Sequence, residues 1–265
     1  MAKKTAKNDR RAVIDDIRKK QKGAERARGL AIVGVCGVIA VAIVGAAAFN
    51  PIKNSIQTSA YDDSALQDIG ESTSAAGCQD VVKRQADGNQ SHETTGTQIT
   101  YSTAPPAFGP HWNEANIAPA AMSRKFYTVE DRPELESLVH NLEHGYTILW
   151  YDDTVADDDE QMSEIRAIAD KFAGTSNWRY KFIAAPWSAA DQEETTVKGD
   201  EKTQFPEGTH VAFTHWSIGG TNGPGLQDAT KQQGIFQYCE SVSGEALKSF
   251  MKAYPYTDSP EPNAM

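Results

Sequence analysis

The sequence predicts an α/β or α+β domain, a mixed sheet with helices, preceded by one transmembrane helix. Three observations predict it. An uncharged run of 21 residues lies near the N-terminus, between a basic segment and a long acidic remainder. Beyond that run, short apolar segments typical of strands alternate with segments of helical periodicity. The outer part also contains two cysteines, and a chain of 265 residues is long enough to bury a core.

The uncharged run begins at Gly29 and ends at Phe49. At 1.5 Å per helical residue it spans about 30 Å, the thickness of the bilayer hydrocarbon. A cleaved signal peptide is the alternative, because the three alanines at 46–48 resemble a cleavage site. The run is longer than the usual ~7–15 residues of a signal peptide, which favours a retained anchor. Cys36 lies inside the span and follows the bulky Val35, which disfavours a lipoprotein site.

Charge is divided unevenly along the chain. Residues 1–28 carry 11 of the 26 Lys and Arg and 4 of the 36 Asp and Glu, so the remainder has 15 basic and 32 acidic side chains. Basic flanks stay in the cytoplasm, so we expect residues 1–28 inside the cell membrane and the acidic domain outside it. No nucleic-acid partner is expected for this domain.

We therefore divide the chain into five parts. Residues 1–28 form a cytoplasmic tail, 29–49 the transmembrane helix, 50–77 a polar stalk, 78–254 the extracytoplasmic domain and 255–265 a loose tail. Cys78 and Cys239 are the only cysteines outside the anchor, and an oxidising compartment favours a disulfide between them. Two buried thiols are the alternative.

The first elements of the domain follow from local signals. Residues 97–101 predict a strand, and 102–130 a loop rich in Pro and Ala. A helix is predicted to open at Asp131, with Pro133 in its first turn and Glu134 completing a capping box. Gly145 is a good helix stop. The apolar stripe of this helix consists of Leu135, Leu138, Val139 and Leu142.

The second half predicts further elements. Residues 146–151 form a continuous apolar run, typical of a buried strand, and 162–172 a helix ended by Gly174. Residues 178–182 alternate as a strand with one wet face, 189–208 form an acidic loop, 211–213 lie in a strand, and two helices close the domain. This order resembles a thioredoxin-like core. The sequence has no C-x-x-C pair, so thiol redox chemistry is not supported.

The segment LVHNLEHGY (138–146) holds the candidate site. His140 and His144 are four residues apart, one turn on the same helical face. On a helical wheel they fall about 140° and 180° from Leu135, away from the apolar stripe. They therefore face solvent or a second layer of the protein. The loop APPAFGPHW (104–112) is stiffened by prolines and can supply His111 to such a layer.

We expect His111, His140 and His144 to converge, with Glu143 beside them, behind the ligands and not itself a ligand. Imidazole nitrogens bind zinc or copper, so a metal ion or a hydrogen-bonded cluster is predicted. The string H-x-x-E-H also fits a zinc-protease signature. That signature needs a further acidic ligand on a second helix, whereas Gly145 ends this helix at once, so no catalytic residues are predicted.

The motifs PPxxGPH (105–111) and HxLEHGY (140–146) together resemble a bacterial family of unknown function. Its members are common in actinobacteria as single-pass membrane proteins with an outer domain, and the resemblance covers residues 75–260. Members often have serine where this chain has Phe108. The basic head, anchor and mass also resemble an accessory subunit of the corynebacterial cytochrome bc–cytochrome oxidase supercomplex.

This resemblance implies a non-catalytic accessory subunit of a respiratory supercomplex, in contact with cytochrome bc and cytochrome oxidase subunits. Small residues of the anchor recur at helical spacing, at Gly29, Cys36, Ala40 and Ala47, which suits close approach of a partner helix. They are also tolerated in a lone span. The alternatives are an extracytoplasmic zinc- or copper-binding or oxidase-assembly protein and, more remotely, a metallohydrolase.

Overall fold

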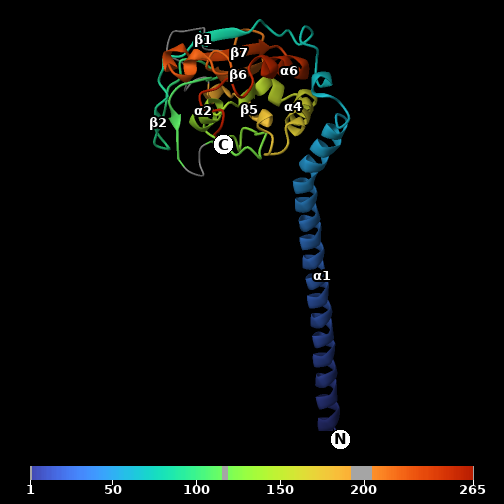
Figure 1. Cartoon of the computed structure of the whole chain (residues 1–265). Coiled ribbons are helices and arrows are strands. Elements are labelled where there is room, and N and C mark those ends of the chain that lie inside the picture. The colour runs from blue at the N-terminus through green and yellow to red at the C-terminus, as the bar shows by residue number, and fades with distance from the viewer. Residues whose placement is uncertain (1, 115–118, 192–204, 265) are drawn as a thin grey trace. The chain divides into compact units, whose positions relative to one another are not determined.

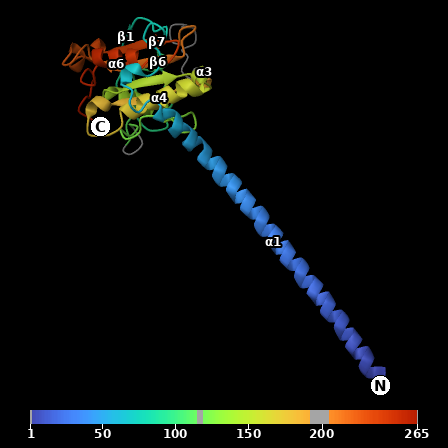
Figure 2. The same ribbon diagram turned by 90° about the vertical axis from the view of Figure 1, so that its right-hand side faces the viewer.

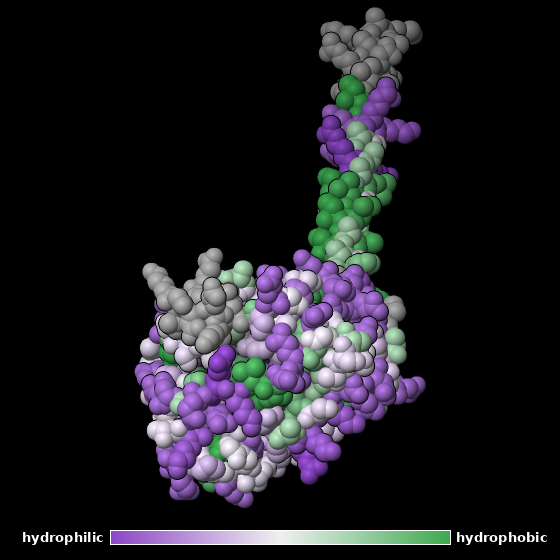
Figure 3. Space-filling model, turned by 90° about the horizontal axis from the view of Figure 1, so that it is seen from above, coloured by the Kyte–Doolittle hydropathy of each residue, from purple (hydrophilic) through white to green (hydrophobic). Residues whose placement is uncertain are grey.

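The computed structural model describes residues 2–114, 119–191 and 205–264, and it divides into two compact units, Met1–Ile56 and Gln57–Met265. The first unit consists of helix α1 (Ala2–Ser59), which continues three residues into the second. Within the described ranges, the stretch Asp16–Ser59 of α1 is the one helix long and apolar enough to cross a membrane. The apolar side chains of this stretch are exposed; Leu30, for example, is 75% exposed and Val41 is 73% exposed. Figure 3 shows this apolar section of α1 next to a strongly polar one.

The segment predicted as a stalk is largely part of the second unit. After α1 ends at Ser59, the chain forms the short 3-10 helix η1 (Leu66–Asp68), and Ile69 and Ala76 are fully buried. The amide of Glu71 donates to the carbonyl of Val242 at 2.9 Å. The folded unit therefore begins before the predicted boundary at Cys78, because two apolar side chains in a polar segment find places in its core.

A five-stranded mixed sheet forms the centre of this unit, as the sequence predicts. Its order is β1 (Val82–Gln85), β7 (Gln233–Cys239), β6 (Val211–Ser217), β4 (Thr147–Tyr151) and β5 (Phe182–Pro186). β4 and β5 are parallel, and the other neighbours are antiparallel. Strands β1, β7 and β6 lie side by side in both ribbon views (Figure 1, Figure 2).

Strands β4, β5 and β6 are buried on both faces of the sheet, because helices lie on each side. Ile148 and Trp150 of β4 pack in a core with α2, whereas Leu149 and Tyr151 pack on the opposite face with α4 and α6. Such burial explains why the strand is a continuous apolar run. Four helices whose full bounds lie in the described ranges belong to this unit: α2 (Leu135–Glu143), α3 (Asp153–Ala156), α4 (Asp159–Lys171) and α6 (Gly244–Ala253).

The predicted disulfide between Cys78 and Cys239 is confirmed, and Cys36 is free. The strands predicted at 146–151 and 211–213 and the helix at 162–172 are also present. The predicted acidic loop at 189–208 lies partly outside the described residues.

Two predicted elements and the predicted start of one helix are wrong. Residues 97–101 form no strand. Helix α2 begins at Leu135, since the Asp131 carboxylate accepts from the Thr128 amide at 2.8 Å and closes a turn rather than a capping box. The first of the two predicted closing helices is strand β7, which pairs with β6 along its whole length.

The predicted half-wet strand at 178–182 is also wrong. Residues 178–180 form the 3-10 helix η2 (Trp178–Tyr180), and β5 begins only at Phe182. Lys181, expected on the wet face, is 1% exposed. Its ammonium donates to the carbonyls of His144, Pro262 and Ala264 at 2.7, 2.8 and 2.7 Å. A lysine is buried here because carbonyl oxygens accept all three of its protons.

The C-terminal segment, expected to be loose, is fixed to the domain. Asp258 is 2% exposed, and its carboxylate accepts from the amides of Ile218 and Gly220 and from the Ser217 hydroxyl. Gly145 allows this close approach: its φ is +90°, and a Cβ there would lie 2.4 Å from the carbonyl oxygen of Tyr256. The glycine that stops α2 therefore also makes room for the end of the chain.

Candidate metal centre

Three elements bring four potential metal ligands together. Helix α2 supplies His140 and Glu143, the short strand β3 (His111–Trp112) supplies His111, and β2 (His92–Glu93) supplies His92. β2 and β3 pair in parallel with His92 directly opposite His111. The convergence predicted for His111 with the helix is thus present, and the second layer that the helical wheel required is the β2–β3 pair.

The four side chains form a compact group. The ring centroid of His111 lies 4.8 Å from those of both His92 and His140. The Nε2 atom of His111 lies 3.0 Å, and that of His92 3.5 Å, from Oε2 of Glu143. One ligand atom from each of the four residues lies within 4.8 Å of all the others, so the group can hold a metal ion.

Hydrogen bonds fix which ring nitrogen is free. Nδ1 of His111 lies 3.0 Å from the carbonyl oxygen of Gly109, and Nδ1 of His140 lies 2.6 Å from that of Trp112. A carbonyl only accepts, so both Nδ1 atoms carry a proton, and in the neutral form of each ring Nε2 is then the nitrogen with the lone pair. Metal-ligating histidines have this arrangement. The Nε2 atom of His111 is buried and has no hydrogen-bond partner.

Burial sets the protonation of the group. Desolvation, followed by the nearby His111, lowers the pKa of His140 to about 4, so its imidazole is neutral at pH 7. Burial alone would raise the pKa of Glu143, but the neighbouring histidines, His111 first among them, outweigh burial and lower that pKa. His92 lies at the surface with 42% of its side chain exposed. Neutral imidazole and carboxylate are the protonation states that bind zinc or copper.

His144 departs from the predicted trio. Its ring centroid lies 4.5 Å from that of His140, but its Nε2 faces the Glu261 carboxylate at 3.5 Å. His144, Glu261 and Glu143 form a second group of potential ligands. Burial and then His140 lower the pKa of His144 to about 3. Glu143 belongs to both groups, so it lies among the ligands rather than behind them as predicted.

Sequence reasoning missed two of these residues. His92 lies in no recognisable motif, and β2 is too short to show a period. Glu261 lies in the segment predicted to be loose. Two other histidines have separate partners: His210 pairs with Asp152 at 2.8 Å, and both ring nitrogens of the buried His215 face carbonyl oxygens.

Residues 92–199 match a family described as "Protein of unknown function (DUF3105)". The matched stretch starts at His92 and includes all four residues of the first group and His144, but it ends before Glu261. No curated protein and no solved structure matches the chain. The family description names no activity, so the geometry of the site carries the functional argument.

Proposed function

We propose that this chain is a membrane-anchored protein whose folded unit binds one zinc or copper ion. The ligands are one imidazole nitrogen of His92, Nε2 of His111 and of His140, and the carboxylate of Glu143. One observation carries the proposal: the two buried imidazoles donate Nδ1–H to backbone carbonyls, and they belong to a group whose potential ligand atoms all lie within 4.8 Å of one another. Such locking of the tautomer is the arrangement that metal sites need.

The donor set also supports a non-catalytic role. Four protein ligands complete a tetrahedral zinc shell, whereas catalytic zinc keeps a position for water. Three nitrogens and one oxygen suit Zn²⁺ or Cu²⁺, and the set lacks the sulfur ligands that select Cu⁺. When bound, the metal would join the β2–β3 pair to α2 as a structural link. The metallohydrolase alternative is therefore the least favoured.

Metal analysis of the purified full chain in mild detergent tests the site. After loading with Zn²⁺ or Cu²⁺ and dialysis, we expect one ion per chain. His92→Ala and His111→Ala should lose it, whereas His144→Ala should retain it because His144 lies in the other group. His210→Ala is the matched control, since His210 pairs with Asp152. The proposal fails if the loaded protein holds no metal, or if His210→Ala loses as much as His111→Ala.

We also propose that the protein is an accessory subunit of an actinobacterial respiratory supercomplex, with its N-terminus in the cytoplasm and its domain outside. The resemblance of its motifs, basic head and anchor supports this. The exposed apolar surface of α1 between Gly29 and Phe49 would contact a cytochrome bc or oxidase subunit. The metal-binding domain would then lie beside redox proteins on the outer face.

Co-purification tests the accessory role. A tagged oxidase subunit extracted in mild detergent should carry this chain at fixed stoichiometry. Ala40→Leu adds bulk at a small residue of the anchor and should weaken recovery, whereas the adjacent Val41→Leu should not. Absence of the chain from the purified complex would reject the role. Protease added to intact spheroplasts should remove the outer domain; protection of that domain would reverse the topology.

We propose, finally, that strands β4 to β7 follow a thioredoxin-like order. The sequence of neighbours β7-β6-β4-β5, with β6 antiparallel to both β4 and β7, supports this. The fold would then serve as a scaffold, because the two cysteines of the outer unit are joined to each other across 161 residues.

A further inference from the structure

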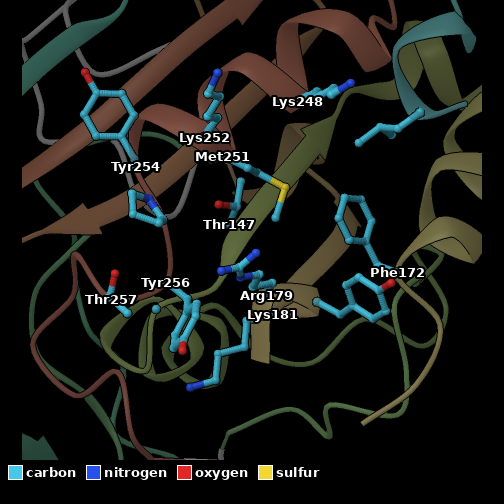
Figure 4. Close-up of a pocket in the computed structure, with 14 residues that line it drawn as sticks. Thr147, Phe172, Arg179, Lys181, Lys248, Met251, Lys252, Tyr254, Tyr256 and Thr257 are labelled. Atoms are coloured by element: carbon cyan, nitrogen blue, oxygen red, sulfur yellow. The ribbon is translucent and has the colours of Figure 1, made fainter. Parts of the chain in front are cut away.

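A pocket of about 710 Å³ opens beside α6. Its wall comes from Thr147 of β4, from η2, from α6 and from the C-terminal segment. Figure 4 places the guanidinium group of Arg179 and the side chain of Met251 toward its middle, with Phe172 on one side and Tyr256 on the other. This volume is in the range of small-molecule sites.

The charge of the pocket is opposite to that of the protein. The chain has a net charge of −10, yet the lining includes Arg179, Lys181, Lys248 and Lys252 and no Asp or Glu. The Lys181 ammonium donates all three of its protons to backbone carbonyls, and Lys248 donates to the Gln67 side chain at 2.8 Å. In the described ranges, no ion pair involves Arg179, Lys248 or Lys252.

Most of the remaining lining is apolar or aromatic. Phe172 and Tyr256 lie on opposite sides of the pocket with Met251 between them, and Leu66 and Pro255 also line it. A hydrated inorganic ion gains no binding free energy from apolar walls, whereas a ligand with apolar surface gains it by burying that surface. Aromatic rings also stack on flat ligands, and a guanidinium binds a carboxylate through two parallel hydrogen bonds.

We propose that this pocket binds a small organic anion with a flat apolar body, such as an aromatic carboxylate. Arg179 binds the anionic group, and Lys248 and Lys252 at the α6 rim add positive potential. The body of the ligand lies against Phe172, Met251 and Tyr256. This site is independent of the proposed metal centre, since the pocket shares no residue with the four ligands.

Naphthalene-2-carboxylate is the probe, and 2-naphthamide is its uncharged counterpart of nearly the same shape. The full chain in lipid nanodiscs is titrated with each while saturation-transfer NMR reports ligand contact, with empty nanodiscs as the blank. We expect saturable binding of the carboxylate and roughly 10- to 100-fold weaker binding of the amide, the range of a charge-assisted hydrogen bond. Equal binding of the two, or no saturable binding of the carboxylate, would overturn the proposal.

Variants locate the binding. Arg179→Gln should weaken the carboxylate by roughly 10- to 100-fold, and Met251→Glu should abolish binding by placing a negative charge in the pocket. Arg84→Gln is the matched control, because Arg84 is an exposed residue of β1 that does not line the pocket. Lys252→Gln serves as the second charge variant if urea unfolding shows that Arg179→Gln is misfolded. Equal weakening by the Arg84 change and the pocket changes would refute the assignment.

Discussion

Lys181 is the side chain whose replacement most directly tests how the C-terminal segment is held. In Lys181→Met the chain keeps its length and apolar stem but loses the ammonium. That ammonium donates to the carbonyls of His144, Pro262 and Ala264, and three aromatic rings lie within 6.0 Å of it, the nearest being Trp178 at 4.8 Å. The substitution therefore removes every contact between the charge and the end of the chain.

The magnitude follows from opposing terms. Hydrogen bonds from a charged donor contribute about 1.5–3 kcal/mol each. Pro262 and Ala264 are half-buried and regain water in the variant, whereas the buried His144 carbonyl does not. Burial lowers the pKa of Lys181 to about 8, and removing the ammonium removes that desolvation cost. We therefore expect a loss of about 3 kcal/mol in the free energy of unfolding, below the simple sum of the three bonds.

Urea unfolding of the full chain in mild detergent, followed by tryptophan fluorescence, measures this loss. Lys248→Met is the matched control, because Lys248 is exposed and should change stability by no more than about 0.5 kcal/mol. Limited proteolysis should also cut residues 255–264 earlier in the Lys181 variant. If both variants unfold at the same urea concentration, the buried ammonium does not hold the segment and our reasoning is wrong.

Three further changes test the fold. Gly145→Ala should lower the free energy of unfolding by about 2–4 kcal/mol, because the residue has a positive φ and the new Cβ would lie 2.4 Å from a carbonyl oxygen. Gly174→Ala is the control: its φ is +109° but no atom lies near its Cβ position, so it should cost about 1 kcal/mol. Equal losses in thermal unfolding would refute the close approach at Gly145. Burial and then neighbouring carboxylates raise the pKa of Glu164 to about 7, so its contribution is fully present below about pH 4.5 and lost as pH rises through about 7. Glu164→Gln should therefore raise stability by about 1–2 kcal/mol at pH 8, after allowance for solvent screening, and not at pH 4; a gain equal at both pH values in urea titrations would contradict this. Replacing Cys78 and Cys239 by serine opens a loop of 161 residues and should lower the urea midpoint by an amount equivalent to at most about 5 kcal/mol, and an unchanged midpoint would exclude a stabilising bridge.

Local patterns in the sequence determined several features. An uncharged run predicts a helix able to span a membrane, because length and hydropathy are properties of the segment itself. The apolar run at 146–151 and the stop at Gly145 are local in the same way. The convergence of His111 with His140 could be predicted because the helical wheel excluded the core face and a proline-rich loop was available to cover it.

Only the tertiary structure decided which side chains complete the site and which segments are fixed. His92 joins the metal group through a pairing of two-residue strands, and Glu261 reaches His144 from the end of the chain. Lys181 and Asp258 are buried by partners far away in the sequence, so their polarity alone predicted exposure. The physical reason is common to all four residues. A short polar segment has no periodicity of its own, and its place is set by hydrogen bonds and ion pairs such as these, which join residues 40 to 117 positions apart along the chain.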